Sequence, residues 1–420
     1  MTGILPILLL PETELSEMPQ KPLAARDLLG KPIFRYTLKV LEGAAESDCL
    51  VVAQQSDAHA AMASYSVDRI FKTSFRNALD DESMEIYKVL VVQADMPCLQ
   101  EDTLKFLLSA VEDDVKASYL QWQGEDLEQE PGLRLGGTAY CFDYDSLQGV
   151  LLNWEGGECS PLDVLSTISE NGDKIVPVAA DGAELISVRT RLDFANAFAC
   201  LQERINDWHM SQGVTILVPG TTYIDADVAI GEDTVIYPGC HLQKGSRIGA
   251  RCTLFPNCRL SAATLEDEVT VENSVLLNCK VGSGSTVGPF AYLRPDTVIG
   301  KHCRIGDFVE VKNSIIGDET KVSHLTYVGD GDLGNNINLG CGVVFSNYDG
   351  KHKHRSVVED DAFIGCNVNL ISPVHIGKEA YVAAGSTVTE NVPDGALYVA
   401  RAKGTNKEGW VEKRKESGKL

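Results

Sequence analysis

A few side chains in the second half of this sequence could carry out acid–base chemistry and bind phosphate. His324 lies in the stretch Ser-His-Leu-Thr-Tyr, and a histidine, with an unperturbed pKa of about 6.5, can take a proton from an amine near neutral pH. Arg294 can hold a phosphate through two parallel hydrogen bonds, and Lys312 can add a point charge. A lone histidine is more often structural than catalytic, and both cations could lie on a solvated face. The three residues form a site only if the fold brings them together.

The element that must position these residues is a repeat in which aliphatic side chains recur every six residues. A fixed period of six is the hexapeptide signature of a parallel β-helix, in which each hexad forms one short strand and a turn. An α-helix has a period of about 3.6 residues and an ordinary strand a period of about two, so neither fits. We therefore predict a left-handed parallel β-helix, with three hexads to each triangular coil. The anchors are Ile224, Ile230, Ile236, Leu242, Ile248, Leu254 and Leu260; then Val269, Val275, Val281, Val287, Leu293, Ile299, Ile305 and Val311; then Ile316, Val322, Val328, Leu333, Leu339 and Phe345; and finally Val358, Ile364, Leu370, Ile376, Val382 and Val388.

The repeat also accounts for several of the twelve cysteines in the chain. Five of them follow an aliphatic anchor by four residues, a position that should need a small inward side chain at a coil corner. A free cysteine behaves as a small hydrophobe, so we interpret these thiols as packing residues. No C-x-x-C pair and no cysteine–histidine spacing typical of zinc occurs in the sequence. The five are Cys240, Cys252, Cys258, Cys279 and Cys303.

Two basic stretches lie outside the regular hexads. The repeat stops between Phe345 and Val358, so residues 346–355, which include Lys351, Lys353 and Arg355, should leave the coil as a loop. From Arg401 onward there are seven Lys or Arg residues and three acidic residues, a local net charge of 7 − 3 = +4. Both stretches could hold an anionic ligand. The alternatives are a tolerated surface insertion and a solvated, frayed terminus.

Composition limits the classes of partner. The chain has 420 residues, enough for two or three domains, and a formal net charge of −23 that argues against nucleic acid or an anionic membrane as the main partner. The first ten residues lack the basic segment of a signal peptide, and no apolar run approaches the roughly 20 residues needed to span a bilayer. We therefore expect a cytoplasmic protein.

The first half has the pattern of an α/β domain. Apolar runs at 4–10, 49–53 and 89–92 predict buried strands, and helical patterns at 103–111 and 192–208 alternate with them. Ligands of such sheets normally bind at the carboxyl ends of the strands. Asp95 follows one of these strands, where a magnesium carboxylate could lie, but a loop or cap aspartate is an equal alternative.

The motifs of the β-helix are similar to those of a known family. Leu293-Arg294-Pro295, Gly306-Asp307-Phe308-Val309-Glu310-Val311-Lys312, Ser323-His324-Leu325-Thr326-Tyr327-Val328-Gly329-Asp330, Asn338-Leu339-Gly340, Asn347-Tyr348-Asp349-Gly350 and Lys407-Glu408-Gly409-Trp410 occur in the family's order. From about Ile224 to Trp410 the chain resembles the bifunctional N-acetylglucosamine-1-phosphate uridylyltransferase/glucosamine-1-phosphate acetyltransferase family. The resemblance is specific, because a hexapeptide repeat alone would leave many acyltransferases open.

The resemblance implies roles for particular residues. It implies that His324 is the general base and that a homotrimer builds each acetyl-transfer site from more than one subunit. Cys341 stands where the family has alanine, and Cys366 where it has serine. Sugar-phosphate ligands would be Arg294, Lys312, Tyr327 and Asn338, and acetyl-CoA contacts would be Cys341, Asn347, Tyr348, Cys366, Ala384 and Arg401.

In the first half the family's nucleotidyltransferase motifs are eroded. Residues 11–17, with three carboxylates and no glycine, replace the glycine-rich phosphate loop, and Lys21 is a possible remnant of that loop's lysine. Gly30-Lys31-Pro32 survives. Asp95 matches the family's metal-binding aspartate, but Arg189 stands where an asparagine is the second metal ligand, and the Gly-Thr pair that contacts uracil is not recognisable between Ser56 and Glu85.

We therefore predict a degenerate nucleotidyltransferase-like, Rossmann-type α/β domain over 1–220 and an acetyltransferase β-helix with its tail over 221–420. The expected reaction is acetyl transfer from acetyl-CoA to glucosamine-1-phosphate, for UDP-N-acetylglucosamine, cell-wall and lipopolysaccharide precursor synthesis. It needs no metal, and Mg²⁺ would be required only if the first domain were active. One alternative is a bifunctional enzyme that retains uridylyl transfer; another is a non-catalytic trimeric scaffold.

Overall fold

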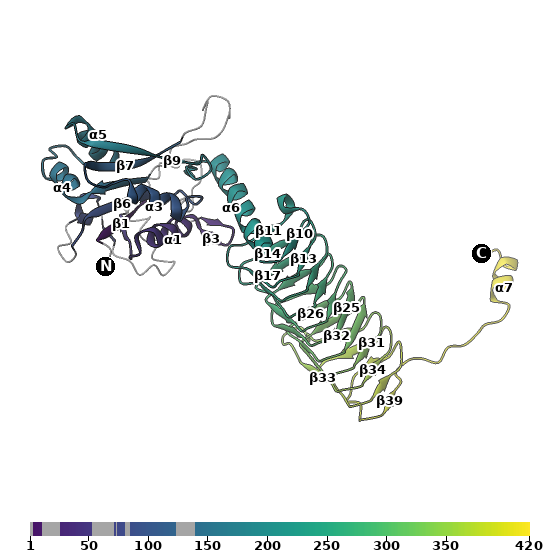
Figure 1. Cartoon of the computed structure of the whole chain (residues 1–420). Coiled ribbons are helices and arrows are strands. Elements are labelled where there is room, and N and C mark those ends of the chain that lie inside the picture. Colours follow the sequence, from purple (N-terminus) through teal and green to yellow (C-terminus); the bar gives the residue numbers. More distant parts are fainter. Residues whose placement is uncertain (1–2, 11–25, 53–70, 73, 80–84, 123–138) are drawn as a thin grey trace. The chain divides into compact units, whose positions relative to one another are not determined.

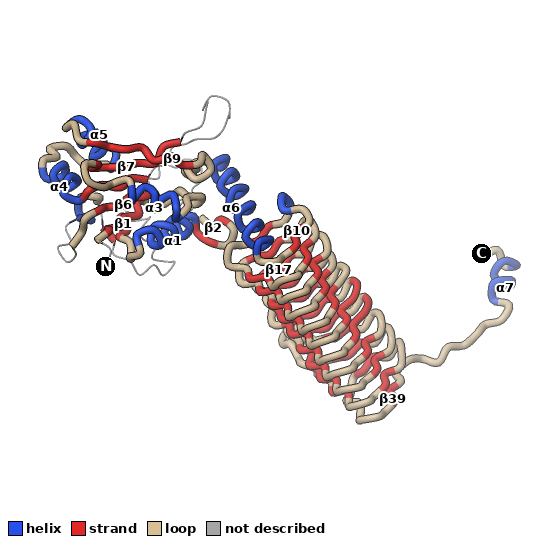
Figure 2. The backbone as a smooth tube through the Cα atoms, in the orientation of Figure 1, coloured by secondary structure: helices blue, strands red, loops and turns tan. Residues whose placement is uncertain are grey.

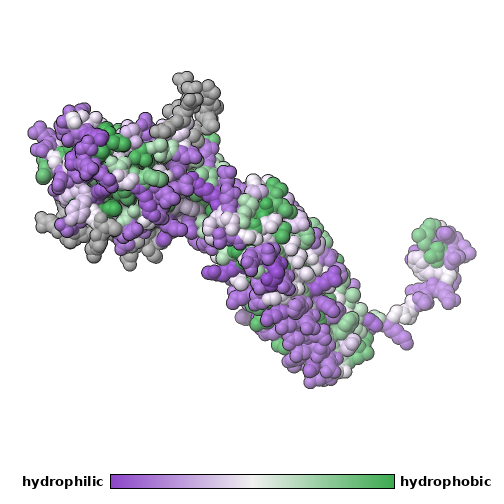
Figure 3. Space-filling view, viewed as in Figure 1, coloured by the Kyte–Doolittle hydropathy of each residue, from purple (hydrophilic) through white to green (hydrophobic). Residues whose placement is uncertain are grey.

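A computed structural model describes residues 3–10, 26–52, 71–72, 74–79, 85–122 and 139–420 of the chain. It divides into two compact units, one of residues 1–208 with 224–226 and one of residues 209–223 with 227–420 (Figure 1). No helix within the described ranges is long and apolar enough to cross a membrane. Hydrophilic side chains cover most of the β-helix surface that is visible in Figure 3.

The first unit is built on a mixed sheet, which has seven strands among the described residues in the order β5-β4-β1-β6-β8-β7-β9. β8 is antiparallel to both of its neighbours, while the remaining pairings are parallel, so the prediction of a mostly parallel α/β domain is confirmed. The strands are β1 (Ile4–Leu9), β4 (Leu50–Val52), β5 (Phe71–Lys72), β6 (Lys88–Gln93), β7 (Val115–Trp122), β8 (Ala139–Asp143) and β9 (Lys174–Ala180), with β2 (Asp27–Leu28) and β3 (Lys31–Pro32) as a separate antiparallel pair.

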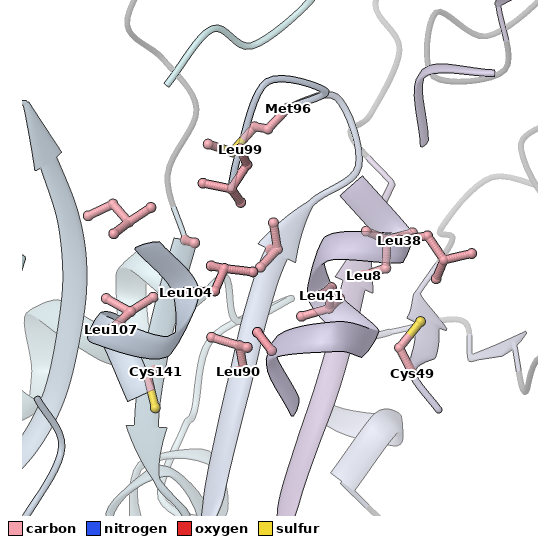
Figure 4. Close-up of a cluster of buried hydrophobic side chains, with 14 of the residues drawn as sticks. Leu8, Leu38, Leu41, Cys49, Leu90, Met96, Leu99, Leu104, Leu107 and Cys141 are labelled. Carbon is pink, nitrogen blue, oxygen red and sulfur yellow. The ribbon is translucent and has the colours of Figure 1, made fainter. Parts of the chain in front are cut away.

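Helices cover both faces of this sheet. Successive residues of a strand point to opposite faces, and in these strands the side chains on both faces are apolar and buried. Leu8 and Leu90 pack with α1 (Ile33–Ala45) and α3 (Glu101–Ser109), as Figure 4 shows. Ile7 and Val89, one residue away on the same strands, pack with α4 (Tyr144–Leu152) and α5 (Pro161–Glu170) on the other face. The other helices among the described residues are α6 (Arg191–Ser211), α7 (Trp410–Glu416) and the short 3-10 turns η2 (Arg76–Leu79) and η3 (Pro219–Thr221).

The second unit is the predicted parallel β-helix (Figure 2), so the predicted fold class is confirmed. Its strands form three parallel faces, which we call the 11-, 10- and 9-stranded faces. The anchors Ile236 and Leu254 are paired in register on successive coils and fully buried, as the six-residue period requires. The first strand begins at Thr215, before the first predicted anchor at Ile224. The sequence did not mark this strand, because no hexad precedes it.

The bounds of the strands follow face by face. The 11-stranded face holds β10 (Thr215–Ile216), β13 (Val235–Ile236), β16 (Thr253–Leu254), β19 (Thr270–Val271), β22 (Thr286–Val287), β25 (Arg304–Asp307), β28 (Lys321–His324), β31 (Asn338–Leu339), β34 (Phe363–Ile364), β37 (Tyr381–Val382) and β39 (Leu397–Tyr398). The 10-stranded face holds β11 (Tyr223–Ile224), β14 (His241–Gln243), β17 (Arg259–Ser261), β20 (Val275–Leu277), β23 (Tyr292–Leu293), β26 (Glu310–Lys312), β29 (Tyr327–Gly329), β32 (Val344–Ser346), β35 (Asn369–Ile371) and β38 (Thr387–Val388). The 9-stranded face holds β12 (Ala229–Ile230), β15 (Arg247–Ile248), β18 (Thr264–Leu265), β21 (Cys279–Val281), β24 (Thr297–Ile299), β27 (Ile315–Ile316), β30 (Gly331–Leu333), β33 (Ser356–Val358) and β36 (His375–Ile376).

The five cysteines that follow an anchor by four residues point inward, as predicted. Cys240, Cys252 and Cys258 are fully buried, while Cys279 and Cys303 are nearly so. The predicted loop is also present, since β32 ends at Ser346 and β33 begins at Ser356.

Candidate functional site

His324 is held by a carboxylate from the preceding coil. β25 and β28 are paired in register so that Asp307 lies directly beside His324, and His324 Nδ1 is 2.5 Å from Asp307 Oδ1. The contact lowers the pKa of Asp307 below its ordinary value, chiefly through the hydrogen bond with His324. An ionised Asp307 accepts a hydrogen bond from Nδ1–H, which leaves Nε2 as the nitrogen that can take a proton from a substrate. Both side chains are reachable, with exposed fractions of 53% for His324 and 36% for Asp307.

A sharp corner follows each of these two residues. Phe308 and Leu325, with φ of 55° and 48°, turn the chain from the 11-stranded face to the 10-stranded face. The same corner in the next two coils is made by Gly342 and Asn367, residue types that adopt this left-handed conformation more readily. The turn leaves Asp307 and His324 at the ends of their strands, on the edge between two faces.

Beyond this corner, the 10-stranded face carries the predicted phosphate ligands. Arg294 directly follows β23, Lys312 ends β26, and Tyr327 begins β29, so the three lie on neighbouring strands. Arg294 Nη1 is 2.7 Å from a carboxylate oxygen of Glu310, which fixes the guanidinium. The hydroxyl of Tyr327 lies over Gly329, where a Cβ atom would be only 2.4 Å from it.

The basic loop adds a further cation to this face. The neighbouring Lys353 lowers the pKa of Lys312, because two ammonium groups in contact disfavour each other's charge. Two like charges held together form a position where a phosphate would be stabilised.

Three aspartates hold the loop in its shape. The carboxylate of Asp349 accepts hydrogen bonds from two loop amides and contacts His354 at 2.7 Å, so its pKa falls to about 2. Arg355 forms an ion pair with Asp332 at the end of the loop. Asn347 is buried, and its amide donates to Asp330 at 2.5 Å. Asn347 therefore secures the start of the loop.

The other predicted acetyl-CoA contacts continue along the corner that carries His324. The backbone N–H of Asn367 donates to the backbone carbonyl of Cys341 at 2.8 Å, and the backbone N–H of Gly385 donates to that of Cys366 at 2.8 Å. Cys341, Cys366 and Ala384 therefore lie on three successive coils. Arg401 Nη1 donates to the carbonyl of Ala384 at 2.5 Å. We call the set Asp307, His324, Cys341, Cys366 and Ala384 the corner column.

Two predicted ligands lie apart from this arrangement within one chain. Asn338 is on the 11-stranded face, between Lys321 and Phe363, and not on the face that carries Arg294. Tyr348 is 59% exposed, and its hydroxyl donates to the carbonyl of Gly350 within the loop.

Sequence reasoning assigned no role to Asp307 or Glu310, and it assigned Lys353 only to a basic loop that could hold an anionic ligand, without its place beside Lys312. The interval of 17 residues between Asp307 and His324, about one coil, was the available signal for the first. No comparable signal marks Lys353, because the irregular loop has no period.

In the first unit, Asp95 lies where the resemblance implies a metal ligand. It is fully buried, and its Oδ2 atom accepts a hydrogen bond from Ser187 at 2.5 Å and lies 3.6 Å from Arg189 Nε. Burial raises the pKa of Asp95 above its ordinary value. Its Oδ1 atom has no hydrogen-bond partner within the described residues.

Mg²⁺ does not fit the described residues here. Mg²⁺ takes oxygen ligands in near-octahedral geometry, usually from one or two carboxylates with waters and substrate phosphates, whereas the cation Arg189 already contacts Asp95. No cluster of three His, Cys, Asp or Glu side chains suited to a metal occurs in the part of the chain that the structure describes. The predicted loss of the glycine loop at 11–17 and the lysine remnant Lys21 lie outside the described residues, as does most of the interval from Ser56 to Glu85.

Comparison with known proteins places both units. Residues 17–151 match the MobA-like NTP transferase domain, and residues 278–313 and 355–390 match the bacterial transferase hexapeptide (six repeats). The bifunctional protein GlmU of Clostridium botulinum is 49% identical over 279 residues, and that of Clostridium beijerinckii is 50% identical over 279 residues. This chain is a relative of the GlmU proteins. The resemblance seen in its sequence is thereby confirmed.

The extent of these matches limits what they carry. The aligned stretch covers 66% of this chain and 61% of each GlmU relative, less than two thirds of the relatives' length. A solved structure of CMP:2-keto-3-deoxy-manno-octonic acid synthetase complexed with CTP covers 48% of this chain and 99% of its own, at 17% identity and a TM-score of 0.36. That similarity is too low to support a conclusion about function.

Proposed function

We propose that the β-helix unit transfers the acetyl group of acetyl-CoA to the amine of glucosamine-1-phosphate. The product, N-acetylglucosamine-1-phosphate, would serve UDP-N-acetylglucosamine, cell-wall and lipopolysaccharide precursor synthesis in the cytoplasm. The observation that carries the proposal is the contact between Asp307 and His324, at a corner that adjoins the face with Arg294 and Lys312. The match of the β-helix unit to the bacterial transferase hexapeptide supports a transferase activity for this unit.

In this proposal His324 removes a proton from the sugar ammonium group. Asp307 holds Nδ1–H, so Nε2 accepts the proton, and the ion pair that forms is stabilised by the neighbouring carboxylate. The free amine then attacks the thioester carbonyl, and collapse of the tetrahedral intermediate releases CoA thiol. No metal is needed for these steps.

The sugar phosphate would be held on the 10-stranded face. Arg294 offers two parallel donors, Lys312 and Lys353 offer point charges, and Tyr327 offers a hydroxyl. Loss of one such charge-assisted hydrogen bond would weaken use of the sugar phosphate roughly ten- to a hundredfold.

Acetyl-CoA would lie along the corner column, with its thioester at His324 and its phosphates toward Arg401. Side chains beyond His324 are small, as a thin pantetheine arm would need. Because Asn338 lies on another face, we propose that a second subunit of a homotrimer supplies it, in keeping with the resemblance.

A second candidate function is uridylyl transfer by the first unit, which the bifunctional relatives favour. Against it stands the contact between Asp95 and Arg189, since phosphoryl-type transfer leans on a metal to offset charge on the oxygens. We therefore propose a monofunctional acetyltransferase. A non-catalytic trimeric scaffold remains the third candidate, and it gives no reason for the Asp307–His324 contact.

A paired assay on the full chain tests all three. CoA release with acetyl-CoA and glucosamine-1-phosphate should be robust, and pyrophosphate release with UTP, Mg²⁺ and N-acetylglucosamine-1-phosphate should stay at background. His324→Ala should lower CoA release by about 10²–10⁴. Asp307→Asn, which keeps an acceptor but not the charge, should lower it less. Full activity of His324→Ala would refute the proposed mechanism, and absence of CoA release from the wild type would favour the scaffold.

A further inference from the structure

Two cysteines follow His324 along the corner column, and both have some exposure to solvent. Cys366 is exposed and Cys341 is half-buried, whereas the cysteines that follow an anchor are buried inside the coil. Packing of the core therefore does not explain the two residues. Both also depart from the related family, in which alanine and serine stand at these positions, so the proposed acetyl transfer does not require thiols here.

The two residues lie side by side on successive coils. β31 and β34 pair in register through Leu339 and Ile364, and the backbone N–H of Asn367 donates to the backbone carbonyl of Cys341 at 2.8 Å. Register therefore places Cys366 directly over Cys341, one coil further along. Neighbouring parallel strands are about 4.8 Å apart, which lies within the Cα separation of about 4.4–6.8 Å that a disulfide spans.

Side chains in this column do contact one another from coil to coil. Asp307 and His324 occupy the same column on the two preceding coils, with the same in-register pairing, and their side-chain atoms meet at 2.5 Å. At Asp307 and His324, outward side chains of successive coils therefore face each other and remain open to solvent.

We propose that Cys341 and Cys366 form a dithiol that is oxidised reversibly to a disulfide by small-molecule disulfides. The thiolate of one cysteine attacks a sulfur of the reagent, which forms a mixed disulfide and releases one thiol. The second cysteine, after losing its proton to solvent, attacks the protein sulfur of that mixed disulfide and releases the second thiol. Two protein thiols are oxidised and one reagent disulfide is reduced to two thiols, so the electrons balance.

The consequence for activity rests on the proposed function. A disulfide between these coils would fix both sulfurs against the corner where the pantetheine arm is proposed to lie, next to His324. Oxidation should therefore block acetyl transfer, and reduction should restore it. Acetyl-CoA should in turn slow the oxidation by covering the two thiols.

The experiment measures the bond and the activity separately. The full native chain is incubated with oxidised glutathione, unreacted thiols are alkylated, and peptide mass mapping identifies the bonds formed. We expect a Cys341–Cys366 disulfide and a loss of CoA release of about tenfold or more, reversed by dithiothreitol. Cys240 and Cys258, which also follow each other on adjacent coils but are buried, serve as the internal control and should stay reduced.

Variants separate this proposal from the proposed function. The double variant Cys341→Ala/Cys366→Ser is compared with itself before and after oxidation and should not lose activity on treatment, whereas each single variant should stop at a mixed disulfide with glutathione. Mapping that finds only separate glutathione adducts, or thiols that stay free, would overturn the dithiol. If the disulfide forms but the reduced protein shows no acetyl transfer, the dithiol proposal stands and the proposed function is refuted.

Discussion

A single methyl group at Gly329 should disturb the proposed sugar-phosphate site. Gly329 lies in β29, paired with Lys312 on the preceding coil, and has no positive φ that would make alanine strained. In Gly329→Ala the new Cβ would lie 2.4 Å from the Tyr327 hydroxyl and 2.7 Å from the amide nitrogen of Asn347. Ordinary contact begins near 3.4 Å, so the hydroxyl must move by about 3.4 − 2.4 = 1.0 Å.

The expected cost follows from this displacement. Overpacking of one methyl should reduce the free energy of unfolding by about 1–3 kcal/mol, which leaves the β-helix folded. A hydroxyl moved by about 1 Å no longer hydrogen-bonds the phosphate well, so KM for glucosamine-1-phosphate should rise roughly tenfold or more. KM for acetyl-CoA should change less, because the corner column is not touched and Asn347, which the new Cβ also crowds, is buried and held by Asp330.

The assay is steady-state CoA release with each substrate varied in turn. Gly220→Ala is the matched control, since a Cβ there meets nothing within 4 Å. Tyr327→Phe removes the hydroxyl by another route, so adding Gly329→Ala to it should raise KM little further. Equal and additive effects of the two changes, or an unchanged KM in Gly329→Ala, would refute the assigned contact.

Four further outcomes are expected. Lys353→Ala should raise the pKa of Lys312 toward its ordinary value, observable by NMR, and weaken sugar-phosphate binding about tenfold. Because the pKa of Asp349 is depressed to about 2, its hydrogen bonds should persist at about pH 4 and be lost only as pH falls toward 2. Rapid hydrogen exchange of the Lys351 and His352 amides already at pH 4 would contradict this. Arg189→Asn should create Mg²⁺ affinity, measured by calorimetry, that the wild type lacks; wild-type binding would count against the blocked site. Ala384→Leu should raise KM for acetyl-CoA but not for glucosamine-1-phosphate.

Much of the fold was predictable because the repeat is regular. One buried aliphatic residue per strand, as at Ile236 and Leu254, fixes both the strand and its place in the coil. The sequence did not predict β10 at Thr215, because no hexad precedes it. Its extended conformation is stabilised by pairing with β13. Local sequence carries no record of such a pairing.

The site was predictable only in part. His324 and Arg294 follow from the family motifs, but the Asp307 partner depends on which side chains meet between coils. The coils of this protein differ in length, so a fixed number of residues does not identify the side chain that lies one coil away at the same corner. Lys353 reaches Lys312 only because hydrogen bonds to Asp349 fold the loop, and no period in the sequence encodes that path.

The arrangement of side chains along the β-helix separates the two proposed substrates. Cations occupy the 10-stranded face beyond the corner, around Arg294 and Lys312, where the phosphate of the proposed substrate would be neutralised. Along the corner itself, the column changes from the charged pair Asp307–His324 to small residues, ending at Ala384. In the proposed function, a sugar phosphate and a thioester that approach from these two directions would meet at His324. The parallel coil would fix that meeting point by register, since each strand is hydrogen-bonded to its neighbours.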